Sequence, residues 1–273
     1  MAARTPVALT IAGSDSGGGA GIQADLKAFA ASGVHGACAI TAITAQNTLG
    51  VDAVHQVPPE VLLAQIRAVA ADLGVDAVKV GMLGSRETTL AVAAALDELG
   101  GAAPVVVDPV MVAESGSRLL APDAQDALVR EILPRADVLT PNVPEARALL
   151  GEEPLPGADD REAERLARAV LALGPSAVVL TGGHRDSATD LLVTREGEAL
   201  AISGPRHADG AAHGSGCTHS AALAASLARG ETLEQAARDA RALAGEAVAR
   251  GLRELGGGAG PVDAIGLAER RQR

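Results

Sequence analysis

Short apolar runs alternate with longer amphipathic segments along nearly the whole chain. The runs are rich in Val, Ala, Leu and Ile and predict buried strands, whereas apolar residues at helical spacing in the longer segments predict helices. The expected strands cover residues 7–12, 37–45, 51–57, 77–81, 104–108, 138–140 and 177–181. The expected helices cover residues 22–32, 59–73, 87–99, 122–133, 144–150 and 160–173.

The C-terminal part adds a hairpin and two more helices. Residues 191–194 and 200–203 flank a Glu-Gly dipeptide and predict a β-hairpin. Helices are then expected from about residue 218 and from residue 233 to about residue 255. This regular alternation predicts a mostly parallel sheet with helices on both faces. No segment has the composition of a linker, so we expect one domain over residues 1–273.

Composition excludes several classes of partner. Apolar residues make up 48% of the chain, but Phe29 is the only aromatic residue, so modules that stack rings on bases are excluded. The net charge of −11 disfavours a nucleic-acid partner. The uncharged stretches 28–51 and 210–228 contain too many polar residues for a membrane span. No signal peptide is visible, and Cys38 and Cys217 have no metal-binding spacing, so a reduced cytoplasm is expected.

Residues 213–218, with the sequence HGSGCT, carry the most specific signal for chemistry. Two glycines allow a sharp turn, after which the amides of Ser215, Gly216, Cys217 and Thr218 can point together from the start of a helix. Such an end has unpaired N–H groups and a partial positive charge, so it favours a phosphate or a developing oxyanion. With Cys217 in the same place, the segment indicates phosphoryl transfer.

Other candidates lie where predicted strands end, which is where open parallel sheets bind ligands. Asp108 can hold a metal or a substrate hydroxyl, or simply begin an Asp-Pro turn. Asn142 and Glu145 offer oxygen ligands that suit hydrated Mg²⁺, although a helix cap also explains Asn142. Lys79 lies in a strand that reads as buried and therefore needs an anionic partner. Met82 belongs either to the core or to a substrate pocket.

The remaining motifs each have two interpretations. Residues 13–21, GSDSGGGAG, fit neither standard nucleotide-loop pattern, and a tight turn explains them equally well. Asp25 can face a ligand or solvent. Gln46 can read the edge of a heteroaromatic ring or end a strand. The glycines after Thr181, including Gly183, allow adenine or a phosphate to approach closely, or form a simple turn.

Together, these motifs resemble the hydroxymethylpyrimidine/phosphomethylpyrimidine kinases of thiamine biosynthesis, in the ribokinase-like superfamily. The most specific parts are residues 18–27 (GGAGIQADLK), 45–47 (AQN), 79–82 (KVGM), 140–146 (TPNVPEA) and 214–218 (GSGCT). The resemblance covers nearly the whole chain and implies a ribokinase-like three-layer sandwich. Cys217 stands where related sugar kinases usually have Asp, and Ser215 stands where Thr is commoner.

The resemblance implies an enzyme that phosphorylates 4-amino-5-hydroxymethyl-2-methylpyrimidine twice with ATP and Mg²⁺, first at the alcohol and then at the monophosphate. It also implies a homodimer. Pyridoxal/pyridoxine kinase activity on the same scaffold is the nearest alternative. A non-catalytic ligand-binding protein is a second alternative. A Rossmann dehydrogenase is a third, and the missing glycine fingerprint weakens it.

The resemblance also assigns candidate site residues. Gly13, Asp25, Gln46 and Met82 are expected to line the pyrimidine pocket, with Val110 close by and Asp25 facing a polar edge of the ring. The expected catalytic residues are Gly214, Ser215, Gly216 and Cys217; the nucleotide contacts are Lys79, Thr181, Gly183 and His213; the metal ligands are Asn142, Glu145 and Asp108.

Cys217 is expected to lie beside the reacting hydroxyl and to act as its base. A free thiol has a pKa of about 8.5, which a helix N-terminus lowers. We therefore expect a thiolate near neutral pH, with the amides of Ser215, Gly216 and Cys217 stabilising charge on the transferred phosphoryl group.

Overall fold

A nine-stranded sheet in the order β3-β2-β1-β4-β5-β6-β7-β8-β9 forms the centre of the molecule. The computed structural model describes residues 4–112, 116, 119–155, 157–184, 188–197, 199–207 and 211–270. The strands are β1 (Val7–Asp15), β2 (His35–Gln46), β3 (Val51–Gln56), β4 (Ala77–Val80), β5 (Val105–Val107), β6 (Val138–Leu139), β7 (Ala177–Leu180), β8 (Thr189–Thr194) and β9 (Leu200–Ser203). Neighbours from β2 to β7 pair in parallel, and β3, β8 and β9 pair antiparallel.

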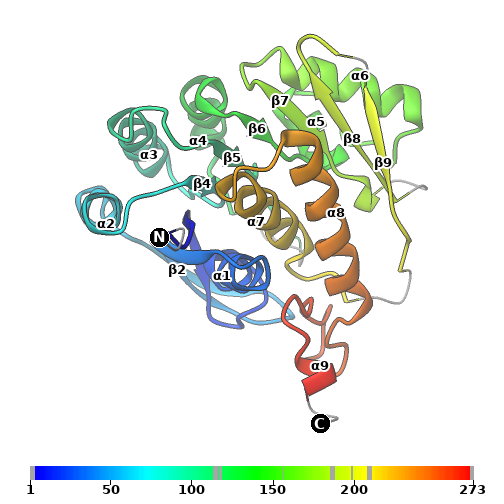
Figure 1. The fold of residues 1–273 in the computed structure, drawn as a ribbon, viewed down its shortest axis with the longest axis horizontal. Coiled ribbons are helices and arrows are strands. Elements are labelled where there is room, and N and C mark those ends of the chain that lie inside the picture. Colours follow the sequence, from blue (N-terminus) through cyan, green and yellow to red (C-terminus); the bar gives the residue numbers. More distant parts are fainter. Residues whose placement is uncertain are drawn as a thin grey trace.

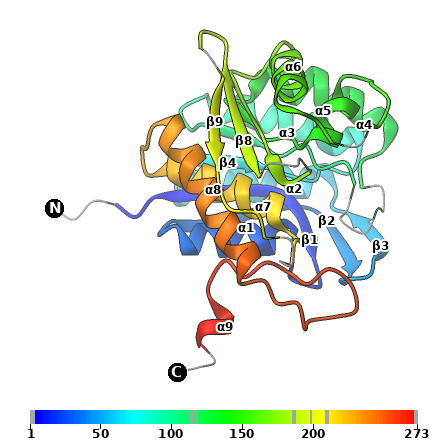
Figure 2. The same ribbon diagram turned by 90° about the vertical axis from the view of Figure 1, so that its right-hand side faces the viewer.

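Helices cover both faces of the sheet, so the predicted three-layer α/β architecture is confirmed (Figures 1 and 2). The helices on one face are α1 (Gly21–Ala31), α7 (Ser215–Ala228) and α8 (Leu233–Ala249). The helices on the other face are α2 (Pro59–Asp72), α3 (Arg86–Glu98), α4 (Pro122–Ala127), α5 (Val143–Leu149) and α6 (Asp160–Leu171). The short helix α9 (Leu267–Arg270) lies near the C-terminus, beyond α8.

The two cores follow from the alternation of side chains along each strand. In β5, Val105 and Val107 join the core under α2–α6, whereas Val106 joins the core under α1, α7 and α8. Small residues dominate the buried face of α7, including Ala221, Ala222, Ala224 and Ala225. This helix therefore packs closely between α1 and α8, over the middle of the sheet (Figure 1).

Three helix boundaries differ by three residues or more from those expected. The helix expected over residues 122–133 is α4 followed by a π turn (η1, Leu128–Ile132) and a 3₁₀ turn (η2, Leu133–Arg135), whose Pro134 cannot continue an α-helix. The last long helix ends at Ala249 because the chain then turns back, and Leu252 N–H donates to Pro261 O at 2.9 Å. The start of α7 at Ser215 lies directly after Gly214, whose φ of 85° only glycine adopts easily.

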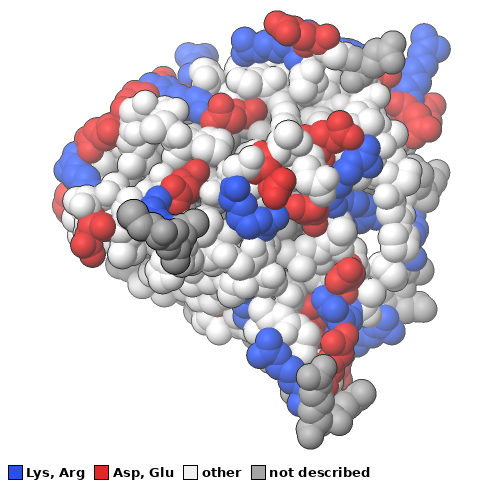
Figure 3. Space-filling model, viewed as in Figure 1, with Lys and Arg blue, Asp and Glu red and all other residues white. Residues whose placement is uncertain are grey.

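Acidic and basic side chains are mixed over the face that carries α1, α7 and α8 (Figure 3). Among the described residues, no helix combines the length and the apolar character needed to cross a bilayer.

Candidate active site

A cavity of about 440 Å³ opens at the carboxyl ends of the parallel strands. It is lined by every predicted site residue except Asp25. Asp108 follows β5, Asn142 follows β6 and Thr181 follows β7, so adjacent parallel strands deliver them to one edge of the sheet. The start of α7 closes the same cavity. The fold therefore brings residues that are far apart in the sequence to one site.

The N-terminus of α7 offers fewer free amides to an anion than the sequence indicated. This anion-binding site is called the anion seat. Ser215 N–H donates to Ala212 O and Thr218 N–H donates to Gly214 O, each at 2.9 Å. Within the described residues, the amides of Gly216 and Cys217 have no hydrogen-bond partner. These amides, rather than the four expected, are available to a phosphate at this helix end.

The Cys217 thiol does not have the lowered pKa that was predicted. Burial raises the pKa of Cys217 to about 12; Lys79 opposes this, Asp108 and Asp25 add to it, and the Gly21 N–H opposes it. The prediction of a thiolate near neutral pH is therefore wrong. The helix N-terminus favours the thiolate, but loss of water and two nearby carboxylates outweigh it.

Lys79 lies fully buried and forms an ion pair beneath the cavity. Its Nζ lies 2.9 and 3.0 Å from the two carboxylate oxygens of Asp25 and 3.7 Å from Asp108 Oδ2. Burial opposes the charged ammonium, but Asp25, Cys217 and Asp108 more than offset it and raise the pKa of Lys79. Lys79 is therefore charged, and the expected anionic partner is present.

The structure corrects the position expected for Asp25. Its side chain is fully buried, binds Lys79 and accepts a hydrogen bond from Thr10 Oγ1 at 2.6 Å. Asp25 thus lies below the cavity and does not face a ring in it. A buried ammonium in β4 requires this carboxylate, which keeps it out of the pocket.

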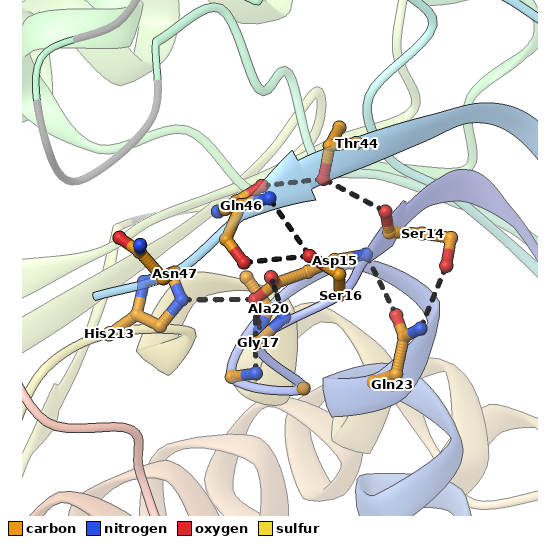
Figure 4. A network of polar contacts seen from close by, with 12 residues as sticks. Ser14, Asp15, Ser16, Gly17, Ala20, Gln23, Thr44, Gln46, Asn47 and His213 are labelled. Carbon is orange, nitrogen blue, oxygen red and sulfur yellow. Dashed lines mark hydrogen bonds and ion pairs between the residues drawn. The ribbon is translucent and has the colours of Figure 1, made fainter. Parts of the chain in front are cut away.

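Asp15 organises the glycine-rich loop, a role that the sequence did not reveal. Its carboxylate accepts hydrogen bonds from the amides of Gly17, Gly19 and Ala20 at 2.7–3.0 Å, and His213 Nε2 lies 3.1 Å from its Oδ2 (Figure 4). Burial opposes the carboxylate, but the His213 contact and the amides outweigh it and lower the pKa of Asp15. His213, expected to touch the nucleotide, lines the cavity and also ties this loop to the start of α7.

Gln46 lies beside the same loop and is held there by Ser16 and Thr44 (Figure 4). Its backbone N–H donates to Ser16 Oγ at 2.8 Å, and Ser16 Oγ donates to its carbonyl at 2.7 Å. Its amide oxygen lies 3.0 Å from Thr44 Oγ1, which leaves the amide nitrogen to face a ligand. A Cβ on Gly13 would lie 2.6 Å from Met82 Cε, so a larger residue at position 13 would displace the end of the Met82 side chain in this wall.

The predicted metal ligands include a helix cap. Glu145 N–H donates to Asn142 Oδ1 at 2.8 Å and Asn142 N–H donates to Glu145 Oε2 at 2.9 Å, a reciprocal capping box at the start of α5. Ser220 Oγ donates to Asp108 Oδ2 at 3.0 Å. Burial and the charge of Asp108 raise the pKa of Glu145 to about 8, with the Asn142 N–H opposing them. Asp108 and Glu145 thus form an acidic pair that shares a proton at neutral pH, and a cation bound beside them would favour the loss of that proton.

Among the described residues, no three His, Cys, Asp or Glu side chains cluster as a metal site. The protein offers only part of a coordination shell here. Mg²⁺ bound at phosphates keeps several waters and needs only one or two carboxylates, so the acidic pair suits that kind of binding.

Asp190 and His219 form a buried pair that sequence analysis missed. His219 Nε2 lies 2.9 Å from Asp190 Oδ2, and Gly182 N–H donates to Asp190 Oδ1 at 2.8 Å. Both side chains line the cavity near Gly183. Asp190 lies in a hairpin strand and His219 in an uncharged helical run, so neither position carried a signal of its own.

Comparison with known proteins places the chain in a family. The family model for phosphomethylpyrimidine kinase matches residues 15–263. The chain belongs to this family. It is 51% identical to a hydroxymethylpyrimidine/phosphomethylpyrimidine kinase of Rhizobium meliloti, over 94% of this chain and 96% of the relative.

Solved structures of two kinds of kinase share the fold. A Clostridium difficile phosphomethylpyrimidine kinase is 39% identical, with a TM-score of 0.76 over 87% of this chain and 97% of that chain. A Bacillus subtilis pyridoxal kinase, solved as an ADP complex, is 35% identical, with a TM-score of 0.87 over 97% and 99%. The family is therefore a kinase family on a scaffold shared with pyridoxal kinases.

The Glu145 carboxyl predicts a pH-dependent stability. Because the pKa of Glu145 is raised from 4.5 to about 8, the folded protein holds a proton that the unfolded chain has lost. The free energy of unfolding should therefore fall as pH rises from about 5 to about 8. Glu145→Gln keeps the capping box but cannot bind or release this proton. The fall in the free energy of unfolding with pH should therefore lose the contribution of one proton. Urea unfolding across this range measures it, with Glu60→Gln on exposed α2 as the control. An unchanged slope in Glu145→Gln would contradict the assignment.

Proposed function

We propose that the chain phosphorylates 4-amino-5-hydroxymethyl-2-methylpyrimidine with ATP, first to the monophosphate and then to the diphosphate, in thiamine biosynthesis. One observation carries the proposal: the unpaired Gly216 and Cys217 amides share a cavity with Gln46 and Met82. An anion seat and a pocket for a small ring thus lie at one site. Membership of the phosphomethylpyrimidine kinase family supports the proposal, and kinase neighbours solved with ADP support ATP as the phosphoryl donor. We also propose that the described residues form a single domain.

The roles of the site residues follow from their positions. The Gly216 and Cys217 amides stabilise charge on the transferred phosphoryl group, and one well-aimed donor of this kind is worth roughly 2.7–4 kcal/mol. Gln46 presents its amide nitrogen to the ring, beside Met82 and Val110. Thr181 and Gly183 line the nucleotide end. Lys79 contributes positive charge from below and holds Asp108 nearby.

We propose that Mg²⁺ binds with ATP beside Asp108 and Glu145, largely through water. When bound, it neutralises charge on the phosphates. The pair fits this role because each carboxylate has a second oxygen without a hydrogen bond from the described residues: Ser220 binds Asp108 Oδ2, and the Asn142 N–H binds Glu145 Oε2.

In the first step, the hydroxymethyl oxygen forms a bond to the γ-phosphorus, the bond to ADP breaks, and a base takes the hydroxyl proton. We propose Cys217 as this base. Because burial raises its pKa to about 12, the thiolate is a minor species at neutral pH. The rate of this step should therefore rise with pH through the neutral range.

Substrate comparison tests the proposed function. With Mg²⁺ and ATP, the purified protein should phosphorylate the hydroxymethylpyrimidine and its monophosphate, with kcat/KM for the pyrimidine about tenfold or more above that for pyridoxal. EDTA should abolish turnover and added Mg²⁺ should restore it. The reverse preference would instead support a pyridoxal kinase, the alternative that the similarity to pyridoxal kinases favours. ATP turnover that no ring substrate stimulates would contradict both.

Replacing the thiol tests the proton acceptor. Cys217→Ala should lower kcat for the hydroxymethylpyrimidine by roughly 10²-fold or more and remove the rise of kcat with pH. The monophosphate is already ionised, so the second step should lose much less. Cys38→Ala, in β2, removes the other free thiol and serves as the control. A kcat that stays within a few-fold of wild type would rule out Cys217 as the base.

We propose a homodimer formed through the face of the β2–β3 pair that carries Ile43, Ala45, Ala53 and His55. Ile43 is 53% exposed, and β3 is an edge strand of the sheet. An apolar face beside an unpaired edge is a common association surface.

Two free thiols support a cytoplasmic location, which cell fractionation can check.

Light scattering during size-exclusion chromatography tests the dimer. The wild type should have about twice the chain mass of 27.1 kDa, and Ile43→Lys should shift it toward the monomer because a buried ammonium at an interface lacks a partner. Leu73→Lys, at an exposed position after α2, is the control. A wild-type monomer at micromolar concentration would contradict this proposal.

A further inference from the structure

The two ring nitrogens of His219 differ, because one has a hydrogen-bond partner among the described residues and the other has none. Its side chain is buried, with the residue only 4% exposed, and its Nε2 lies 2.9 Å from Asp190 Oδ2. Its Nδ1 is buried and has no hydrogen-bond partner among the described residues. A buried polar atom without a partner is uncommon and destabilising, so such an atom beside a cavity indicates a missing ligand group.

The Asp190 carboxylate fixes where this nitrogen lies. One oxygen contacts His219 and the other accepts the Gly182 N–H at 2.8 Å, so the imidazole lies beside the loop after β7. His219 is also one turn along α7 from Ser215 and Gly216, on the helix whose N-terminus forms the anion seat. His219 therefore lines the nucleotide end of the cavity, on the other side of the anion seat from the Gln46 end.

The partner of Nε2 decides what Nδ1 can bind. Burial opposes ionisation of Asp190, but the contact with His219 and the Gly182 N–H lower the pKa of Asp190, so its carboxylate is ionised and can only accept. The imidazole proton must then lie on Nε2. In the neutral ring, Nδ1 keeps its lone pair and accepts a hydrogen bond. In that form Nδ1 suits a hydroxyl or an amino group of a ligand.

We propose that His219 Nδ1 accepts a hydrogen bond from a hydroxyl or amino group of the bound nucleoside triphosphate, and that Asp190 is the positioning residue that orients the ring. This rests on the proposed function only in taking the cavity to bind ATP. A purely structural His219 would need Nε2 alone. The empty Nδ1 is what separates the two roles.

Two substitutions separate the nitrogens. His219→Gln keeps a donor near the position of Nε2, within reach of Asp190, but has no acceptor where Nδ1 lies. His219→Asn keeps an amide near the position of Nδ1 and loses the contact with Asp190. By calorimetry, His219→Gln should raise the Kd for the ATP analogue AMP-PCP by roughly 3- to 10-fold. The KM for the pyrimidine and the melting temperature should change little. His219→Asn should lower the melting temperature, and His35→Gln, at an exposed position in β2, is the control.

Nucleotide analogues identify the donor. If Nδ1 binds the adenine amino group, GTP should bind the wild type more weakly than ATP. If Nδ1 binds a ribose hydroxyl, 2′-deoxyATP or 3′-deoxyATP should bind the wild type more weakly than ATP. In either case His219→Gln should remove most of that difference, because the two changes delete the same contact. A wild type that fails to bind AMP-PCP, or a His219→Gln Kd within twofold of wild type, overturns the inference. Because Kd is measured without turnover, a Kd effect in a protein that does not phosphorylate the pyrimidine would support this inference and contradict only the proposed function.

Discussion

The site depends on the close approach of two backbone segments that meet at glycines, Gly19 and Gly214. A Cβ on Gly214 would lie 1.8 Å from Gly19 O, and a Cβ on Gly19 would lie 2.2 Å from His213 Cδ2. No other residue allows the loop after β1 to touch the start of α7 in this way. Asp15 then secures the contact through loop amides and His213. The N-terminal and C-terminal parts of the chain thus form one cavity wall, and the amides of α7 open into the cavity.

Charge beneath this wall shapes the chemistry of the cavity. Lys79 and Asp25 are both fully buried, and the ammonium is held by Asp25 with Asp108 slightly further away. A buried pair of this kind is a poor source of stability but holds its members in fixed positions. Cys217 lies between opposite influences, since Lys79 favours its thiolate while desolvation and two carboxylates oppose it. The protonated state of the Cys217 thiol is therefore the result of a balance that bound charges can alter.

The cavity has two ends that meet at the N-terminus of α7. Gln46 and Met82 define one end, where Met82 Cε packs against Gly13. Asp190 and His219 define the other, where one carboxylate braces both a loop amide and an imidazole. The free amides of Gly216 and Cys217 lie between them, an arrangement that suits transfer between two bound groups.

The sequence by itself determined the alternation of strands and helices, the parallel sheet, and the residue types gathered at its edge, because these follow from local periodicity and from motifs of a few adjacent residues. It did not determine which of those residues face the cavity. Asp25 and Lys79 are 54 positions apart, and Asp15 and His213 are 198 apart, so no local pattern reveals these pairs. Tertiary structure likewise decided that the pKa of Cys217 is raised and not lowered, that fewer amides are free, and that Asp190 pairs with His219. Desolvation, charge and hydrogen-bond competition depend on every group that packs around an atom, and only the folded chain specifies those neighbours.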